Sequence, residues 1–312
     1  MSHKIQGFSI LTIAMILLAS SFVAGKSMAA SVPISVALAV RLLLSAAIFV
    51  PLLVQRERRL PRLGRRCCCL LCLEALLGVV VFNVLVFEAY KYASAASVGI
   101  VFGMLPIIVA VMSAVFLAER LRGPAIIAIL LAAMGTAQLS QANASTAWAE
   151  AVTTIGLLLT FGAVLCEGAF TILGKALARL LSPLATAALV SVVGMLMIAP
   201  FAVDDARDFD FAGVATCDWL ALVWWAMASG IGYFWLWFAG LACVDAHAAG
   251  VVTVALPLST LPLSSLLLHE TITSEHLIGA GCAMAAVLII SIPSPRMPRL
   301  FLGTSARVSR NS

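Results

Sequence analysis

Charged side chains are scarce in this chain of 312 residues. Only 11% of the residues are charged and 63% are hydrophobic, whereas average soluble domains carry roughly 25% charged residues. So few charges do not cover the surface of a water-soluble body of this size, which excludes an ordinary cytosolic enzyme and a disordered protein. The mean hydropathy of +1.12 agrees. The composition therefore indicates a polytopic membrane protein.

The sequence also lacks the patterns that bind a metal, a nucleotide or a nucleic acid. The eight cysteines have no zinc-site spacing with histidine, and the segment SSFVAGKS at 20–27 lacks the first glycine of a phosphate-binding loop. The net charge of +5 lies in short patches between apolar runs, which argues against a nucleic-acid partner. We therefore expect no metal, no cofactor and no ATP site. Any work that the protein does would be driven by an ion gradient rather than by ATP, with the proton as a candidate coupling ion.

Ten apolar runs are candidate transmembrane helices, because a helix needs about 20 mostly apolar residues to cross a bilayer. The first run has the basic start of a secretory signal peptide, but its length favours a retained helix. The predicted fold class is an all-α membrane protein with ten transmembrane helices. Their approximate limits are Phe8–Met28, Pro33–Val54, Cys67–Tyr90, Ser94–Ala118, Pro124–Gln141, Val152–Leu173, Pro183–Val203, Trp219–Leu241, Ala246–Leu268 and His276–Ile292.

The distribution of Lys and Arg predicts the orientation of these helices. With the N-terminus inside, 15 of the 19 basic residues fall in inner segments, and only Lys26, Lys91 and Arg207 fall in outer ones. Both termini are therefore predicted to be cytoplasmic, and 294–312 is predicted to be a cytoplasmic basic tail. The lipid bilayer is the expected environment, and ten spans are enough for a monomer.

An internal repeat divides the chain. Residues 95–120 read AASVGIVFGMLPIIVAVMSAVFLAER, and residues 246–271 read AHAAGVVTVALPLSTLPLSSLLLHET. At a shift of 151 residues the two segments share a proline (Pro106, Pro257) and a glutamate (Glu119, Glu270). The halves are predicted as 5–141 and 152–293. Five spans in each half force the second half into the membrane upside down, and such inverted repeats recur in secondary transporters.

These residues resemble the drug/metabolite transporter superfamily, in its EamA-like branch. The resemblance rests on Gly25 and Lys26 near the end of the first run, on Arg41 in the second, and on the matched Pro and Glu of the fourth and ninth. It implies two EamA-like five-helix units in a bacterial cytoplasmic membrane, which export or exchange small organic solutes such as amino acids. An intramembrane enzyme or a scaffold that transports nothing is the alternative.

Three polar residues inside the runs are the main candidates for solute contact, because ionisable groups in hydrocarbon are costly unless paired or hydrated. Glu167, with Thr171 on the same helix face, is either a substrate-amine or proton site or one half of a structural ion pair. Arg41 is a counter-ion of Glu167, a ligand for a substrate carboxylate, or a structural arginine. Asn83 is expected to face the interior.

The eighth run is aromatic. Trp225 and Tyr233 recur at helical spacing, so they form either a wall for apolar or cationic solutes or part of an interfacial aromatic belt. For Trp219 and Trp237, at the two ends of the run, we favour an interfacial belt.

Four residues are candidates for gating. Pro106 and Pro257 interrupt backbone hydrogen bonding, which gives either flexible gates or static kinks. Lys26 and Lys175 occupy pseudo-equivalent places near span ends, where they either gate or anchor the helices.

The two repeated glutamates and one glycine of the repeated segments are predicted to stabilise the fold rather than to contact the solute. Glu119 and Glu270 each precede a helix and are predicted to help cap its N-terminus. Gly99 is predicted to permit close helix approach.

Overall fold

The computed structural model describes residues 2–57, 63–117, 126–127, 130–131, 134–135, 147–177, 180–241, 252 and 255–291. Every regular element within these ranges is a helix. By length and composition, six helices there are able to cross a membrane: Gln6–Met28, Ile34–Glu57, Arg65–Tyr90, Thr153–Gly174, Pro183–Asp208 and Thr216–Trp237. Three shorter apolar helices cover Ala95–Val109, Ala255–Leu268 and Ser274–Ile289.

Nine of the ten predicted runs coincide with helices in these described ranges. Five of the nine are single uninterrupted helices: α1 (Ser2–Met28), α2 (Ile34–Glu57), α8 (Ala147–Leu177), α9 (Pro183–Asp208) and α14 (Ser274–Ser291). Pro124–Gln141 lies mostly outside the described residues, as do Glu119 and the chain from 292 onward. The count of ten helices therefore stays a prediction.

Serine caps set two of the helix starts. The Ser94 side chain accepts a hydrogen bond from the backbone N–H of Ser97 at 3.0 Å, at the start of α5 (Ala95–Phe102). Ser182 accepts one from Ala185 at 3.0 Å, at the start of α9, where Pro183 fills the first turn. The first backbone N–H groups of a helix have no partner within the helix, and a serine hydroxyl often accepts a hydrogen bond from one of them. Proline is also common in the first turn of a helix.

The third and eighth runs are each built from three consecutive elements: α3 (Arg65–Leu73), η1 (Glu74–Val81) and α4 (Phe82–Tyr90), then α10 (Thr216–Trp225), η2 (Ala226–Gly232) and α11 (Tyr233–Leu241). Both central elements are π-helical. The backbone N–H of Phe82 bonds to the carbonyl of Leu77, and that of Tyr233 bonds to the carbonyl of Ala228. The two wide turns lie 151 residues apart, which is the shift of the sequence repeat. π-helical turns are rare in proteins, and those that do occur are often found at functional sites.

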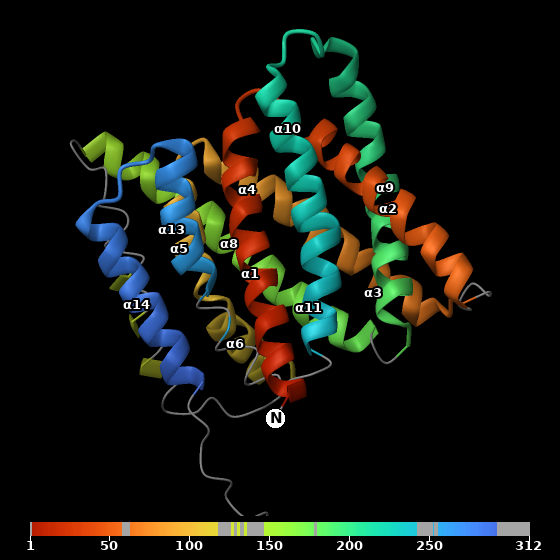
Figure 1. Ribbon diagram of the computed structural model, residues 1–312, viewed down its shortest axis with the longest axis horizontal. Coiled ribbons are helices and arrows are strands. Elements are labelled where there is room, and N and C mark those ends of the chain that lie inside the picture. The colour runs from red at the N-terminus through yellow and green to blue at the C-terminus, as the bar shows by residue number, and fades with distance from the viewer. Residues whose placement is uncertain are drawn as a thin grey trace, which may run out of the picture.

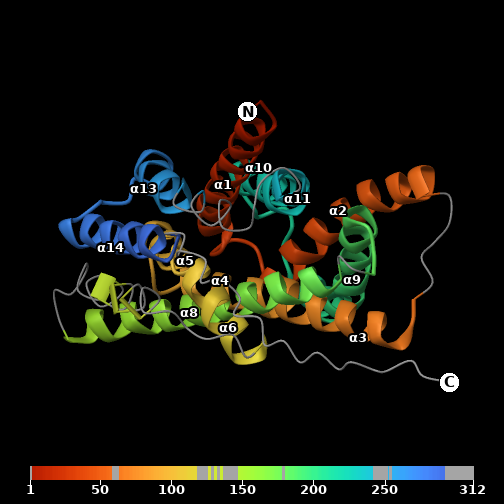
Figure 2. The same ribbon diagram turned by 90° about the horizontal axis from the view of Figure 1, so that it is seen from below.

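The two predicted halves interleave. α1 packs against α10, α11 and α13 (Ala255–Leu268), while α8 packs against η1, α4 and α6 (Leu105–Leu117). Each first helix thus contacts the third and fourth helices of the other half, and Figure 2 shows α1 and α8 on opposite sides of the bundle. A Cβ on Gly99 of α5 would lie 2.6 Å from Thr260 of α13, which confirms that Gly99 permits close approach.

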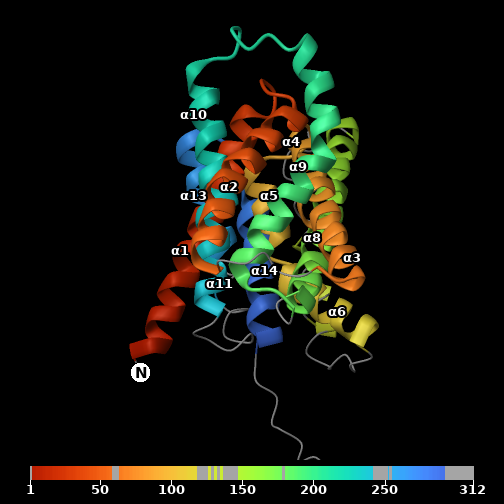
Figure 3. The same cartoon turned by 90° about the vertical axis from the view of Figure 1, so that its right-hand side faces the viewer.

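Corresponding helices of the two halves run in opposite directions (Figures 1 and 3). α1 starts at the lower end of the bundle, whereas α8 starts at the upper end, and α2 and α9 are likewise opposed. The start of α1 and the end of α14 (Ser274–Ser291) lie at the same end. The connection from α9 to α10 lies at the other end.

Pro106 interrupts the fourth run. α5 ends at Phe102 and α6 begins at Leu105, with a tight turn in which the N–H groups of Gly103 and Met104 bond three residues back at 2.9 Å. Proline supplies no N–H for a helical bond, so the break follows from its chemistry. Pro257 lies in the described part of α13.

Candidate functional site

A cavity with an empty volume of about 750 Å³ lies between the two halves, and both of them line it. We call it the aromatic cavity after eight of its lining residues: Phe22, Phe82, Tyr90, Phe102, Trp225, Tyr233, Phe234 and Trp237. Its polar lining residues are Ser21, Arg41, Asn83, Glu167 and Ser229. Five of the six residues predicted to contact the solute therefore lie in one cavity wall. The sixth, Thr171, instead donates its hydroxyl to the carbonyl of Glu167 at 2.9 Å.

Arg41 is buried on α2 and held from two sides. Its Nη1 donates to Oδ1 of Asn83 at 3.1 Å, and Nδ2 of Asn83 donates to the carbonyl of Val79 in η1 at 2.6 Å. The guanidinium carbon lies 5.0 Å from the centre of the Trp225 ring, a cation–π distance. Nε of Arg41 has no hydrogen-bond partner. The arrangement fixes a positive charge in the cavity wall and leaves one donor unused.

Glu167 lies on α8 and is partly accessible where it lines the aromatic cavity. The ion pairs formed by the described residues are Lys91 with Glu88 and Arg207 with Asp204, so Arg41 and Glu167 do not make a direct salt bridge. Arg41 and Glu167 therefore line the same cavity as two separate charged groups.

The aromatic rings of the wall pack against one another in groups. Trp225 packs edge-on against Phe87 with ring centres 5.3 Å apart, and Tyr233 stacks on Trp237 at 5.8 Å. Trp237 was expected in an interfacial belt, but its ring lines the cavity because it follows Tyr233 by one helical turn. Trp219 stacks instead on Phe211, near the connection from α9 to α10.

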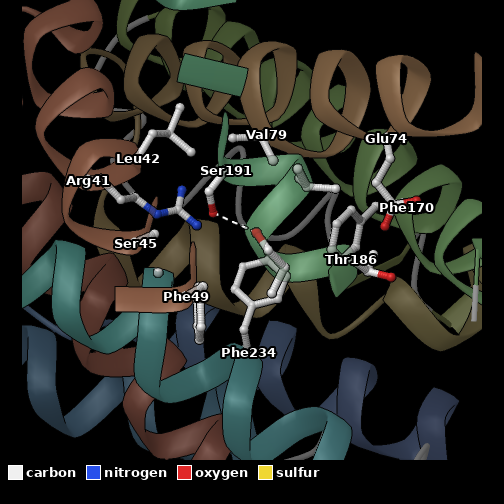
Figure 4. Close-up of a pocket in the computed structure, with 13 residues that line it drawn as sticks. Arg41, Leu42, Ser45, Phe49, Glu74, Val79, Phe170, Thr186, Ser191 and Phe234 are labelled. Atoms are coloured by element: carbon white, nitrogen blue, oxygen red, sulfur yellow. Dashed lines mark hydrogen bonds between the residues drawn. The ribbon is translucent and has the colours of Figure 1, made fainter. Parts of the chain in front are cut away.

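A second cavity, with an empty volume of about 420 Å³, adjoins the first, and Figure 4 shows the residues that line it. We call it the Glu74 cavity; its other lining residues include Arg41, Ser45, Phe49, Phe170, Thr186, Ser191 and Phe234. Arg41 and Phe234 line both cavities. Glu74 is missing from the sequence-based candidates. The signal was its position as an acid inside the apolar run Cys67–Tyr90.

Phe170 of α8 stands between Glu74 and the aromatic cavity. A Cβ on Gly78 would lie 2.2 Å from the Phe170 ring, so only glycine leaves room for that ring beside η1. The other side of Phe170 meets Phe234 edge-on, with ring centres 5.6 Å apart. These two rings and Arg41 form the wall between the cavities.

Lys26 ties the end of α1 to the turn that follows α4. Its Nζ donates to the carbonyls of Tyr90 and Ala93, the latter at 2.9 Å. A lysine at the C-terminal end of a helix satisfies free carbonyls and complements the helix dipole. Lys26 thus makes a specific contact with the chain at one end of the bundle. The side chain of Lys175 lies outside the described residues.

Glu270 contacts the same turn from the second half. Its carboxylate accepts the backbone N–H groups of Ala95 at 2.8 Å and Ala96 at 3.1 Å, at the start of α5. The prediction that Glu270 caps the helix that follows it was therefore wrong, because it caps a helix of the other half. His269 ends α13 with a positive φ of 54°, which turns the chain toward α5. We call these contacts of Lys26 and Glu270 the end latch.

Comparisons with known proteins agree with this architecture. The model of the EamA-like transporter family matches residues 5–141 and 154–292. The protein named "Uncharacterized transporter YetK" of Bacillus subtilis (strain 168) is 28% identical over 282 residues, which cover 90% of this chain and 86% of that protein. An "Uncharacterized transporter" of Archaeoglobus fulgidus is 24% identical over 215 residues, 68% of this chain and 74% of its own.

A solved crystal structure aligns with a TM-score of 0.63 over 90% of this chain and 94% of its own, at 19% identity, which shows a shared fold. Because the family model covers both halves, the chain belongs to the EamA-like transporter family, whose members are membrane transporters rather than enzymes.

Proposed function

We propose that the protein is a secondary transporter that exports small organic metabolites, such as amino acids or related solutes, by alternating access. The observation that carries this proposal is the aromatic cavity, which both halves line and which holds Arg41, Glu167 and Asn83 together. Transporters of inverted-repeat construction bind their solutes at the interface of the repeats. A cavity with these groups at that interface is what such a site requires.

Two inverted halves, residues 5–141 and 152–293, form the moving parts. The opposed directions of α1 and α8 and the two wide turns 151 residues apart support this division. In such proteins the two similar halves exchange conformations, so that one site faces each side of the membrane in turn. The turns in η1 and η2 adjoin the cavity and supply part of its wall through Gly78 and Ser229.

The wall chemistry favours solutes that carry an amine, with or without a carboxylate. Glu167 offers a carboxylate to an ammonium group, and the guanidinium of Arg41 offers a positive charge to a solute carboxylate. Trp225 and Tyr233 present aromatic faces, which attract cations and apolar groups. Amino acids and organic cations carry these features.

The end latch and the helix breaks are the candidate gates. Lys26 and Glu270 both hold the chain between α4 and α5, and the contact of Glu270 joins the two halves, so its release would let the halves separate at that end. Leu105 and Leu256, each next to a repeated proline, line the aromatic cavity. Movement at Pro106 or Pro257 would therefore change the cavity directly. Lys175 is the proposed counterpart of Lys26 at the opposite end.

We place the protein in a bacterial cytoplasmic membrane as a monomer, with both termini in the cytoplasm and the proton as coupling ion. The excess of Lys and Arg in the inner segments supports this orientation. So does the position of the start of α1 and the end of α14 at one end of the bundle (Figure 1).

The test is solute flux into vesicles that contain the purified protein. The panel consists of radiolabelled amino acids and quaternary ammonium cations, and Glu167→Gln is the variant. We expect the variant to fold normally and to lose most transport of cationic and zwitterionic solutes, because it removes the carboxylate that faces the ammonium group. Glu88→Gln is the matched control, since Glu88 pairs with Lys91 at the exposed end of α4.

Loss of flux in Glu167→Gln with full activity in Glu88→Gln supports the assignment. Normal flux of every solute in Glu167→Gln would remove Glu167 from the site. A wild-type protein that moves none of the panel would overturn the proposed solute class.

A further inference from the structure

Glu74 is a buried acid without a partner. Its side chain is 0% exposed, and neither carboxylate oxygen has a hydrogen-bond partner. Glu74 is the first residue of the π-helical element η1. A Cβ on Gly174 of α8 would lie 3.2 Å from Oε1 of Glu74, which shows how closely α8 approaches the carboxylate.

The groups that face Glu74 come from three helices. Arg41 of α2 lies across the cavity, and Figure 4 shows it at the opposite side of the cavity from Glu74. Glu167, the acid nearest along α8, lines the adjoining aromatic cavity. The hydroxyls of Thr186 and Ser191 on α9 line the Glu74 cavity but donate to carbonyls of their own helix. Among the described lining residues, Arg41 and Glu74 alone are ionisable.

An ionised carboxylate in this position has no donor to replace its lost hydration, which is costly in an apolar interior. A proton removes the charge and needs no further ligand. A metal cation needs several oxygen ligands around it, and the described residues contain no group of three or more His, Cys, Asp or Glu side chains that could hold one. The surroundings therefore fit a proton better than a metal ion.

We propose that Glu74 is a proton-binding site, separate from the aromatic cavity, through which a proton gradient drives transport. This inference rests on the proposed transport function. Arg41 lines both cavities, so the charge at Glu74 acts on the solute site through the shared arginine.

The charges of the three groups give the direction of coupling. With Glu74 ionised, Arg41, Glu167 and Glu74 together carry a net charge of −1, which favours a cationic solute. With a proton on Glu74 the net charge is zero, and a cationic solute binds less tightly. Proton and solute thus exclude one another, so an inward proton gradient would expel the solute.

The first experiment detects the proton without any solute. Infrared difference spectra of the protein in vesicles are recorded between mildly acidic and alkaline pH. We expect the carbonyl band of a protonated, weakly hydrogen-bonded carboxylic acid, which Glu74→Gln abolishes and Glu88→Gln retains. If Glu74→Gln leaves every carboxylic-acid band in place, Glu74 holds no proton and the proposal is overturned.

The second experiment separates coupling from solute binding, using the panel of amino acids and quaternary ammonium cations. Solute accumulation driven by a pH gradient is compared with exchange of labelled for unlabelled solute at equal pH. We expect Glu74→Gln to lose accumulation driven by the pH gradient completely. Its exchange should be slower than that of the wild type, because glutamine keeps the net charge at zero as a bound proton does, and it should no longer change with pH. Glu167→Gln is expected to lose both.

A structural role for Glu74 would leave the dependence on the pH gradient unchanged. Accumulation by Glu74→Gln that still follows the pH gradient therefore overturns the proposal, as does accumulation that follows a sodium gradient instead. If the wild type moves none of the panel, the proposed function fails, and the infrared band alone decides whether Glu74 binds a proton.

Discussion

The two cavities that meet at Arg41 differ in how their polar groups are satisfied. In the aromatic cavity, Arg41 donates to Asn83, Asn83 donates to the backbone of η1, and Trp225 covers the guanidinium. In the Glu74 cavity the hydroxyls of Thr186 and Ser191 donate to backbone carbonyls four residues earlier in the chain, and neither carboxylate oxygen of Glu74 has a hydrogen-bond partner. The first cavity has an ordered framework that suits recognition of a solute. The second contains a group whose charge depends on whether a proton is present.

The strongest way to break this comparison is to remove the residue that both cavities share. We expect Arg41→Leu to reduce the rate of solute uptake by about 100-fold or more, because truncating one partner of a buried, hydrogen-bonded charge costs about 2–5 kcal/mol. Arg41→Lys should also lose activity, since lysine keeps the charge but not the planar fork. Uptake rates in vesicles measure both effects.

Arg207→Leu is the control for Arg41, because Arg207 is exposed and forms an exposed ion pair with Asp204 at 3.7 Å. Thermal unfolding of each variant separates a folding defect from a transport defect. An active Arg41→Lys protein would mean that charge alone suffices, and an active Arg41→Leu protein would contradict the shared role.

The next test concerns the wall between the cavities. We expect Gly78→Ala to lower the free energy of unfolding by about 1–3 kcal/mol, the usual cost of overpacking, because the new methyl group overlaps the Phe170 ring. Gly281→Ala is a matched control: Gly281 also lies in an apolar helix, and a Cβ added there would meet no other atom within 4 Å. Phe170→Leu should partly rescue Gly78→Ala. Equal melting temperatures for the two alanine variants would show that the wall adapts.

The sequence predicts the helices of this protein well and its polar contacts less well. Hydropathy finds runs such as Pro33–Val54 and Pro183–Val203 within a few residues of α2 and α9, because crossing the membrane demands long apolar helices. The sequence also identifies Arg41, Asn83 and Glu167 as candidates, because polar residues in the middle of a transmembrane helix must face the protein interior.

Features that depend on tertiary packing escape the sequence. Glu74 sits among so many apolar residues that its run is unmistakably a span, and only the structure shows that no donor reaches it. The cap that Glu270 provides joins segments about 175 residues apart, so local spacing assigned it to the wrong helix. The pairing of Arg41 with Asn83 rather than Glu167 likewise follows from how α2 and α4 meet.

The end latch tests whether the two cavities open separately, because the latch adjoins the aromatic cavity and not the Glu74 cavity. Tyr90 lines that cavity, and its carbonyl accepts from Lys26. We expect Glu270→Gln to increase labelling of Ser21→Cys by a membrane-impermeant maleimide about fivefold, since a lost helix cap costs about 1 kcal/mol. The measurement uses a background without the native cysteines.

Ser45→Cys is the comparison position for the latch, because Ser45 lines the Glu74 cavity. Its labelling should not respond to Glu270→Gln. An equal increase at Ser21→Cys and Ser45→Cys would mean that the two cavities open together, and no increase at Ser21→Cys would exclude the latch as a gate.

The smallest expected effect is that of changing Trp225, whose ring packs against the guanidinium of Arg41. Trp225→Phe keeps an aromatic wall but weakens the cation–π contact, which is worth about 0.5–1 kcal/mol even at exposed sites. We therefore expect a two- to fivefold higher KM for cationic solutes, with the infrared band of Glu74 unchanged. Trp224→Phe is the matched control, because Trp224 is next in the chain, half-exposed, and bonded to Ser20 rather than to the cavity. A shift of the Glu74 band in Trp225→Phe would show that Trp225 also influences Glu74, and the two cavities would then have to be treated as one site.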